Sequence, residues 1–382
     1  MSIRSLFRVS FVGLVAAVTG AMALPSSTDS AAGVDALGMR LGAATPASIG
    51  PLAFGPENVL FLADRKGATL WAVNVTDTEQ AQFTERVVVP DLDQKVAALL
   101  GTTRDKLRFA DMAVNPKGGA LYFSVNRLVD SGSVPAVVRA LGPDKLELVN
   151  LDKIRYSSAP LPEAPSRDAK SPWGQPQWTM SITDLAFVDG ELWVAGLSNE
   201  QFASALRRMP FPFGKQGAVT TVEIFHTSHD KWETAAPIEA FLPITLNGVP
   251  SILAGYGCSP IATFNRADLK DKTHLRGRTV AELGGGSRPI DMLRYENEGK
   301  EWILIANNNR TLMRVDPAEV AKAPALEKGV SHAFEPAGVG YLPIASTGVM
   351  HIADLGATGI AVMVRDTESG AVNVINYSKK WM

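Results

Sequence analysis

One pattern recurs along almost the whole chain and restricts the fold more than any other feature. Each copy contains a short apolar strand, a turn with Gly or Asn, a second strand ending in a small and a polar residue, and a third strand. The copies are spaced by roughly 50 to 70 residues, which is the range of supersecondary repeats. They begin at residues 49, 109, 182, 237, 289 and 337.

A repeat of this kind predicts a small antiparallel sheet of four strands. One such sheet cannot bury both of its faces, whereas six sheets stacked around an axis can do so. The 33 glycines and 24 prolines fit a chain of many short strands and tight turns. We therefore predict an all-β fold, a six-bladed β-propeller, with a seven-bladed ring containing one degenerate blade as the alternative.

The first residues have the order of a secretory signal peptide. Arg4 and Arg8 precede an apolar run over 11–18, and Ala21, Met22 and Ala23 follow. The run is too short to span a bilayer. We predict a signal peptide over 1–23, an N-terminal extension over 24–48, a single propeller domain over 49–382, and a periplasmic or secreted location without a membrane span.

Charge and cysteine content exclude some classes of function. The 37 basic and 39 acidic residues nearly cancel, so no nucleic-acid partner is expected. Cys258 is the only cysteine, and an exported chain without an internal disulfide must be stabilised by its packed core.

Three local features are predicted around the repeats. Residues 91–101 have apolar residues at helical spacing, with Asp91 as N-cap and Gly101 as the stop. Residues 157–180, with five prolines and two tryptophans, form an ordered surface loop or a lid over the ring. Residues 371–377 form the outermost strand of the last blade, and no strand is recognisable as exchanged between the ends of the ring.

The repeats resemble the NHL and SMP-30-like propellers. The segments LFLAD, LWVAG, LIANN and MHIAD stand where those families have a YVAD-like motif. The runs AALLGTT, AGLSNEQFASALRRMPFPF and HTSHDKWET are similar to a family of exported bacterial propellers without an assigned activity. The resemblance implies the fold and contributes no functional residues.

Strand order predicts which loops share a face of the ring. In a meander of four strands, the loop after the second strand and the loop into the next blade lie on the same side. Residues 219–227 read as the fourth strand of blade three, and His274 lies beyond a third strand, away from that side. The groups expected at the channel mouth are His226, His229, Glu233, Glu239, Cys258 and His332.

The first position of the innermost strands is mostly acidic. Across the six copies it is Pro51, Asp111, Asp184, Glu239, Asp291 and Gly338. Two carboxylates about 6 Å apart repel by roughly 3 kcal/mol at an effective dielectric constant near 20, so a positive group must lie nearby. Arg108 and Arg288 are one candidate pair. The alternative is a divalent cation such as Ca²⁺, with amide oxygens supplied by Asn126, Asn199, Asn307, Asn308 and Asn309.

The stretch HTSHDKWET carries an HxxHxxxE pattern. His226 and His229, with Glu233 or Cys258, could bind zinc or copper if the loop turns both rings to one side. Alternatively, the histidines hydrogen-bond the loop backbone, and Cys258 is an inert thiol.

The leading functional hypothesis is a non-catalytic exported propeller that binds a small molecule or a periplasmic protein at the channel mouth, with a structural cation in one version. No GxSxG or CxxCH motif indicates a serine hydrolase or attached haem. The alternative is a metal-dependent hydrolase of lactonase type, with the metal at the central channel and Asp184 or Asp291 as base. A third hypothesis is a subunit of a periplasmic redox enzyme, anchored by Trp173, Trp178 and Trp232.

Overall fold

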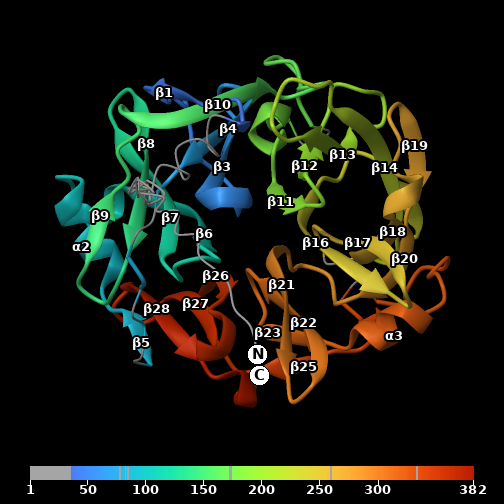
Figure 1. Ribbon diagram of the computed structural model, residues 1–382. Coiled ribbons are helices and arrows are strands. Elements are labelled where there is room, and N and C mark those ends of the chain that lie inside the picture. The colour runs from blue at the N-terminus through green and yellow to red at the C-terminus, as the bar shows by residue number, and fades with distance from the viewer. Residues whose placement is uncertain are drawn as a thin grey trace, which may run out of the picture.

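Six small sheets stand in a ring around a common axis (Figure 1). This computed structural model describes residues 36–76, 79–81, 83, 86–171, 174–258, 260–332 and 334–382. The predicted signal peptide and the first part of the extension lie outside the described residues. The described part has no helix both long and apolar enough to cross a bilayer. The predicted six-bladed propeller is confirmed.

Each blade runs from an inner strand beside this axis to an outer strand at the rim. Blade 1 contains β2 (Leu52–Phe54), β3 (Val59–Asp64), β4 (Thr69–Asn74), β10 (Ile154–Pro160) and β1 (Arg40–Gly42). Blade 2 contains β6 (Leu107–Val114), β7 (Leu121–Val129), β8 (Gly132–Ala140) and β9 (Leu146–Leu148). Blade 3 contains β11 (Asp184–Val188), β12 (Glu191–Leu197), β13 (Ser204–Pro210) and β14 (Ala218–His226), edged by β15 (Lys231–Glu233) and β19 (Thr273–Arg276).

The remaining three blades follow the same plan. Blade 4 contains β16 (Ile238–Leu246), β17 (Val249–Tyr256), β18 (Pro260–Asn265), β20 (Arg278–Glu282) and β24 (Ala337–Gly338). Blade 5 contains β21 (Pro289–Asn297), β22 (Lys300–Asn307), β23 (Leu312–Val315) and β25 (Leu342–Ile344). Blade 6 contains β26 (Val349–Asp354), β27 (Ile360–Arg365), β28 (Val372–Tyr377) and β5 (Val87–Val89).

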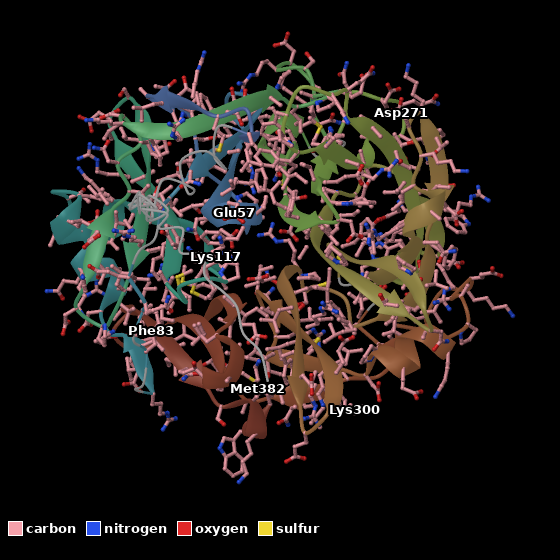
Figure 2. The ribbon with its side chains drawn as sticks, viewed as in Figure 1. Glu57, Phe83, Lys117, Asp271, Lys300 and Met382 are labelled. Atoms are coloured by element: carbon pink, nitrogen blue, oxygen red, sulfur yellow. The ribbon has the colours of Figure 1, made fainter. Side chains whose placement is uncertain are left out.

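The blades do not follow one another around the ring in chain order. Inner strand β2 lies beside both β6 and β11, and β6 lies beside β26, so blade 2 stands between blades 6 and 1 (Figure 1). The side chains of Lys117 and Glu57 join blades 2 and 1 through an ion pair of 2.7 Å (Figure 2). The chain thus steps backward once, from blade 1 to blade 2, and then returns to blade 3.

The ring is closed by an early segment of the chain. Strand β5 pairs antiparallel with β28, with Val89 opposite Val374. The expectation that 371–377 is the outermost strand, with no exchanged strand, is wrong, since β5 lies outside it. Three valines are too short a run to be recognised as a strand in the sequence. Strand β10 similarly completes blade 1, so 157–160, predicted as part of a surface loop or lid, is strand.

The predicted start of blade 6 is displaced by one strand. Residues 337–338 form β24 at the rim of blade 4, and 342–344 form β25 at the rim of blade 5. The inner strand of blade 6 is β26, which holds the segment MHIAD. The innermost position of this blade is therefore occupied by His351 rather than Gly338.

The core is divided among the six junctions between neighbouring blades. In β3, Leu60 and Leu62 pack toward blade 2, while Phe61 and Ala63 pack toward blade 3. Both faces of a strand are then buried, which explains uninterrupted apolar runs such as VLFLA. Each fully buried Leu or Phe contributes about 2–3 kcal/mol, so the ring is stable without a disulfide.

Helix α2 (Leu92–Leu99) confirms the short helix predicted within residues 91–101, between the first and second blades in the sequence. It buries Leu92 and Val96 among residues of blades 2 and 6. Asp91 stands at the N-cap position, but its side chain makes no capping hydrogen bond because its backbone is left-handed, with φ 49°.

Candidate functional site

A charged cavity of about 340 Å³ lies where the inner strands begin. All four acids predicted at the channel mouth line it, although they come from four different blades. The charged and imidazole groups in its wall are Arg65, Asp111, Asp184, Glu239, Arg288, Asp291 and His351. Their role in function remains a prediction.

Local irregularities in the inner strands direct these side chains. The pairing of β6 and of β21 skips one residue immediately before Asp111 and Asp291, which is a β-bulge. Strand β26 has the same skip before His351. In β16 the skipped residue is Glu239 itself. Since a bulge re-aims the side chain, Glu239 is not structurally equivalent to the aspartates with which the sequence repeat aligns it.

The three aspartates join neighbouring blades through backbone hydrogen bonds. Each accepts an N–H from the inner strand of the adjacent blade, and two also accept the N–H of their own next residue. The three inter-blade bonds are Leu52 N to Asp111 Oδ2 at 2.6 Å, Phe241 N to Asp184 Oδ2 at 2.8 Å, and Ile352 N to Asp291 Oδ2 at 3.0 Å. These carboxylates are therefore part of the architecture of the ring.

His351 supplies one positive charge within the cavity. Its Nδ1 lies 3.2 Å from Asp111 Oδ1 and 3.7 Å from Asp291 Oδ2. These are ion-pair separations without the alignment of a hydrogen bond. Burial opposes the charge, but Asp111 and Asp291 outweigh it and raise the pKa of His351 to about 10. Sequence reasoning missed this residue because it misplaced the inner strand of blade 6.

Two arginines supply the other positive charges. Arg65, which follows LFLAD, donates from Nε to the Ile182 carbonyl at 2.6 Å and links blade 1 to blade 3. Arg288 has a half-exposed side chain, and its Nη1 lies 4.0 Å from Glu239 Oε1. The predicted use of Arg108 is wrong, because its guanidinium donates to the carbonyls of Asp105 and Leu107 and does not line the cavity.

Burial shifts the pKa of several groups in the cavity wall. It raises the pKa of Asp184 well above its ordinary value, against the hydrogen bond from Phe241 N. It also raises the pKa of Asp291 and Glu239, although Arg288 and Arg65 oppose the shift at Glu239. Burial lowers the pKa of Arg65. Three basic groups thus face four acidic groups in the cavity wall.

The asparagines predicted to supply amide oxygens lie outside the described cavity wall. Asn308 Oδ1 accepts the backbone N–H of Arg288 at 2.7 Å, and Asn126 Nδ2 donates to the Ile49 carbonyl at 2.9 Å. Both amides are used to fix loops. The basic side chains in the described cavity wall are Arg65, Arg288 and His351.

A second cluster lies between blades 3 and 4. His226 ends β14, His229 ends the 3-10 turn η4 (Thr227–His229), Glu233 ends β15, and Cys258 lies in the turn between β17 and β18. A donor atom of each of His226, His229 and Cys258 lies within 4.8 Å of those of the other two. The histidine rings are 4.0 Å apart between centroids, so the turn places both on one side.

Glu233 holds both histidines through one carboxylate. His226 Nδ1 lies 2.8 Å from Oε2, and His229 Nδ1 lies 2.7 Å from Oε1. Burial opposes the charge of Glu233, but hydrogen bonds with His226 and His229 lower its pKa to about 2. An ionised carboxylate only accepts hydrogen bonds, so each histidine donates from Nδ1.

The other ring nitrogen of His226 is buried without a hydrogen-bond partner. The side chain is 3% exposed, and Nε2 lies 3.8 Å from Glu282 Oε2, which accepts a hydrogen bond from Thr227 Oγ1 at 2.8 Å. This cluster adjoins the cavity, since a methyl group at Gly257 would lie 3.8 Å from Glu239 Oε1.

The remaining predicted residues lie elsewhere. His332 is exposed and belongs to neither cluster. His274 is in β19 and contacts Thr221 Oγ1 at 2.9 Å, away from both clusters.

The predicted anchor tryptophans that the structure describes contact different arginines. Trp232 is 38% exposed, beneath the Arg276 guanidinium. Trp178 is partly buried against Arg167, and Trp173 lies outside the described residues. The described residues of 157–180 do not line the cavity, which gives the predicted lid no support.

The fold and the cavity define a six-bladed propeller with a charged central site. No protein-family model matches the chain, and no curated protein matches its sequence.

Solved structures share a weak likeness over most of the chain. A putative oxidoreductase (glucose dehydrogenase) of Thermus thermophilus is 14% identical, covering 88% of this chain and 99% of that one, with TM-score 0.34. A PQQ-bound aldose sugar dehydrogenase of Streptomyces coelicolor is 11% identical, covering 88% and 95%, with TM-score 0.30. A putative 6-phosphogluconolactonase of Bacteroides uniformis is 10% identical, covering 89% and 82%, with TM-score 0.29.

Proposed function

We propose that this protein is a non-catalytic, exported propeller that binds a small anionic molecule, with a carboxylate or phosphate group, in its central cavity. The observation that carries the proposal is the pair of guanidinium groups, Arg65 and Arg288, in a cavity whose aspartates are already hydrogen-bonded to the ring. The signal-like pattern over 1–23 supports export.

The two guanidinium groups have donors to offer. The described contacts of Arg65 use only its Nε, and the nearest acid to Arg288 is at 4.0 Å. A guanidinium fork matches carboxylate and phosphate oxygens in pairs. The enclosing walls include Leu52, Phe241 and Met292, which reduce the competition of water for such an anion.

Glu239 is the acid that an anion would have to displace. Unlike the three aspartates, it accepts no backbone N–H among the described contacts, and Arg288 is its nearest positive group. Burial already raises its pKa. Uptake of a proton by Glu239 would remove the negative charge that competes with an anion for Arg288, so we expect anion affinity to increase as pH falls.

The metal-dependent hydrolase is less well supported by this geometry. Donor atoms of Asp111, Asp291 and His351 do lie within 4.8 Å of one another. However, both aspartates are already engaged by backbone N–H groups of a neighbouring blade. The hydrolase would be favoured if purified protein retained stoichiometric metal and hydrolysed a lactone.

Calorimetric titration of the full chain with inorganic phosphate and with succinate tests the binding proposal. Arg288→Met should weaken binding at least tenfold, whereas Glu239→Gln should strengthen it severalfold by removing a competing charge. Arg294→Met is the matched control, because Arg294 lies in β21, the strand that Arg288 immediately precedes, and pairs with Glu301 at 3.3 Å instead. Failure of the wild type to bind either anion, or equal binding by Arg288→Met, would overturn the proposal.

A further inference from the structure

We propose that His226, His229 and Cys258 bind one late first-row transition metal ion, zinc or copper, and that Glu233 positions the two histidines. This site is separate from anion binding in the central cavity. It rests on the meeting of three donors from different segments and on a buried imidazole nitrogen that lacks a partner.

The three donors are brought together by the fold rather than by sequence spacing alone. The turn η4 reverses the chain after β14, and β15 returns along it, with His226 opposite Lys231. Cys258 comes from the neighbouring blade, in a turn where its own φ is 63°. This left-handed conformation is uncommon for a residue other than glycine, and it fixes the turn that carries the thiol.

Glu233 leaves one nitrogen of each ring for a metal. Because its carboxylate engages both Nδ1 atoms, at 2.8 and 2.7 Å, the Nε2 atoms retain their lone pairs. Metal-binding histidines in proteins usually donate their other N–H to a carboxylate or carbonyl, which fixes the tautomer and the ring orientation. Here a single carboxylate provides that contact for two rings.

The unpartnered Nε2 of His226 is the second, independent indication. Its side chain is only 3% exposed, and no described group hydrogen-bonds to Nε2. A buried polar atom without a partner is costly and uncommon in a folded protein. A metal ion bonded to Nε2 would satisfy it.

The donor chemistry selects the type of metal. Two imidazoles and a thiolate suit zinc or copper, whereas calcium and magnesium require oxygen donors. Bonds of about 2.0–2.1 Å to nitrogen and 2.3 Å to sulfur place tetrahedral ligands roughly 3.5 Å apart. One ring nitrogen of each histidine and Cys258 Sγ lie within 4.8 Å of one another, so metal binding requires these atoms to approach by up to about 1 Å. The His229 side chain, which is 43% exposed, and the Cys258 turn can provide this movement. Three protein ligands leave a fourth position for water or an exogenous ligand.

The test is equilibrium dialysis of the full chain against zinc, followed by metal quantification after removal of excess metal. Wild type should retain one equivalent. Cys258→Ser and His229→Gln should each lower affinity at least tenfold, and His274→Gln, which alters a histidine outside the cluster, should leave it unchanged. His226 is avoided as a first target because its burial makes misfolding a simple explanation of loss.

Two further readouts separate liganding from mere folding. Because Cys258 is the only thiol, zinc should slow its alkylation by iodoacetamide in wild type but not in His229→Gln. Cobalt in place of zinc should give a thiolate-to-metal charge-transfer band that Cys258→Ser abolishes. Glu233→Gln should weaken affinity by about 10–100-fold while keeping that band at saturation.

Absence of stoichiometric zinc in wild type would overturn the proposal, as would retention by the double variant Cys258→Ser, His229→Gln. Alkylation at equal rates with and without zinc would do the same. Phosphate and succinate titrations of Cys258→Ser should match wild type, so failure of this site is distinguishable from failure of the proposed anion binding.

Discussion

The central cavity and the His226–Cys258 cluster contain similar residue types but satisfy them differently. In the cavity, aspartates are neutralised or hydrogen-bonded by neighbouring blades, and His351 pairs with two acids. In the cluster, one carboxylate orients two imidazoles, and the other nitrogen of His226 has no partner among the described residues. Acids gathered at the axis of the ring can thus serve its architecture, whereas the adjoining His226–Cys258 cluster leaves a buried imidazole nitrogen with neither a hydrogen bond nor a carboxylate closer than 3.8 Å in the described part of the chain.

The largest expected effect is on the architecture of the cavity. Asp184→Ala should lower the free energy of unfolding by about 3 kcal/mol, because it orphans the N–H groups of Leu185 and Phe241. Urea denaturation of wild type and variant measures the difference. Glu239→Gln is the control and should change stability by less than about 0.5 kcal/mol, since among the described contacts Glu239 accepts no backbone N–H from a neighbouring blade and meets only Arg288, at 4.0 Å. Equal destabilisation by both would contradict the assignment of the aspartates as inter-blade links.

A smaller effect is expected from pH. The pKa of His351 is about 10 in the folded protein against 6.5 ordinarily, so the folded state holds its proton more tightly. The contribution of protonated His351 to the free energy of unfolding is complete below about pH 6.5 and is lost as pH rises toward 10. The raised pKa values of Asp184 and Asp291 act in the same direction, because each makes ionisation costly in the folded state.

We expect the free energy of unfolding to fall by about 2 kcal/mol between pH 7 and 10. This fall is smaller than the limit of about 1.36 kcal/mol per pH unit, because Asp111 and Asp291 share the proton with His351. Denaturant titrations across this range measure it. His351→Gln should flatten the profile, and a wild-type profile that is flat or rises would show that His351 is not held as a cation.

The smallest effect is expected at the His226–Cys258 cluster without metal. Cys258→Ser in the presence of a chelator should alter the free energy of unfolding by no more than about 0.5 kcal/mol. Adding zinc at about 100 times its dissociation constant should stabilise wild type by roughly 2.7 kcal/mol and leave the variant unchanged. Thermal unfolding with and without zinc measures both. A large loss on Cys258→Ser under chelation would instead assign the thiol to the core.

The sequence allowed the number of blades and much of the site to be predicted. Apolar strands with turn residues repeat locally, so copies are countable, and the innermost acids fall at one place in the repeat. The HxxHxxxE pattern places His226, His229 and Glu233 in one short segment, so their proximity could be expected.

Other features depend on contacts between distant segments, which local patterns do not show. Arg65 and His351 become neighbours of the acids only through the ring. Short rim strands such as β5 and β25 have too few residues to show a period of two. The bulge that separates Glu239 from the aspartates is invisible in an ungapped alignment of repeats.

The closing strand β5 has a consequence for biogenesis. Its partner β28 is made near the end of translation, whereas β5 is made near the beginning. Throughout synthesis, and during any transport of an unfolded chain, the segment Val87 to Val89 cannot pair with β28 and remains a short exposed apolar segment. The ring can lock only after the full polypeptide is available, so nascent or truncated products would remain open and would be readily recognised by chaperones and proteases.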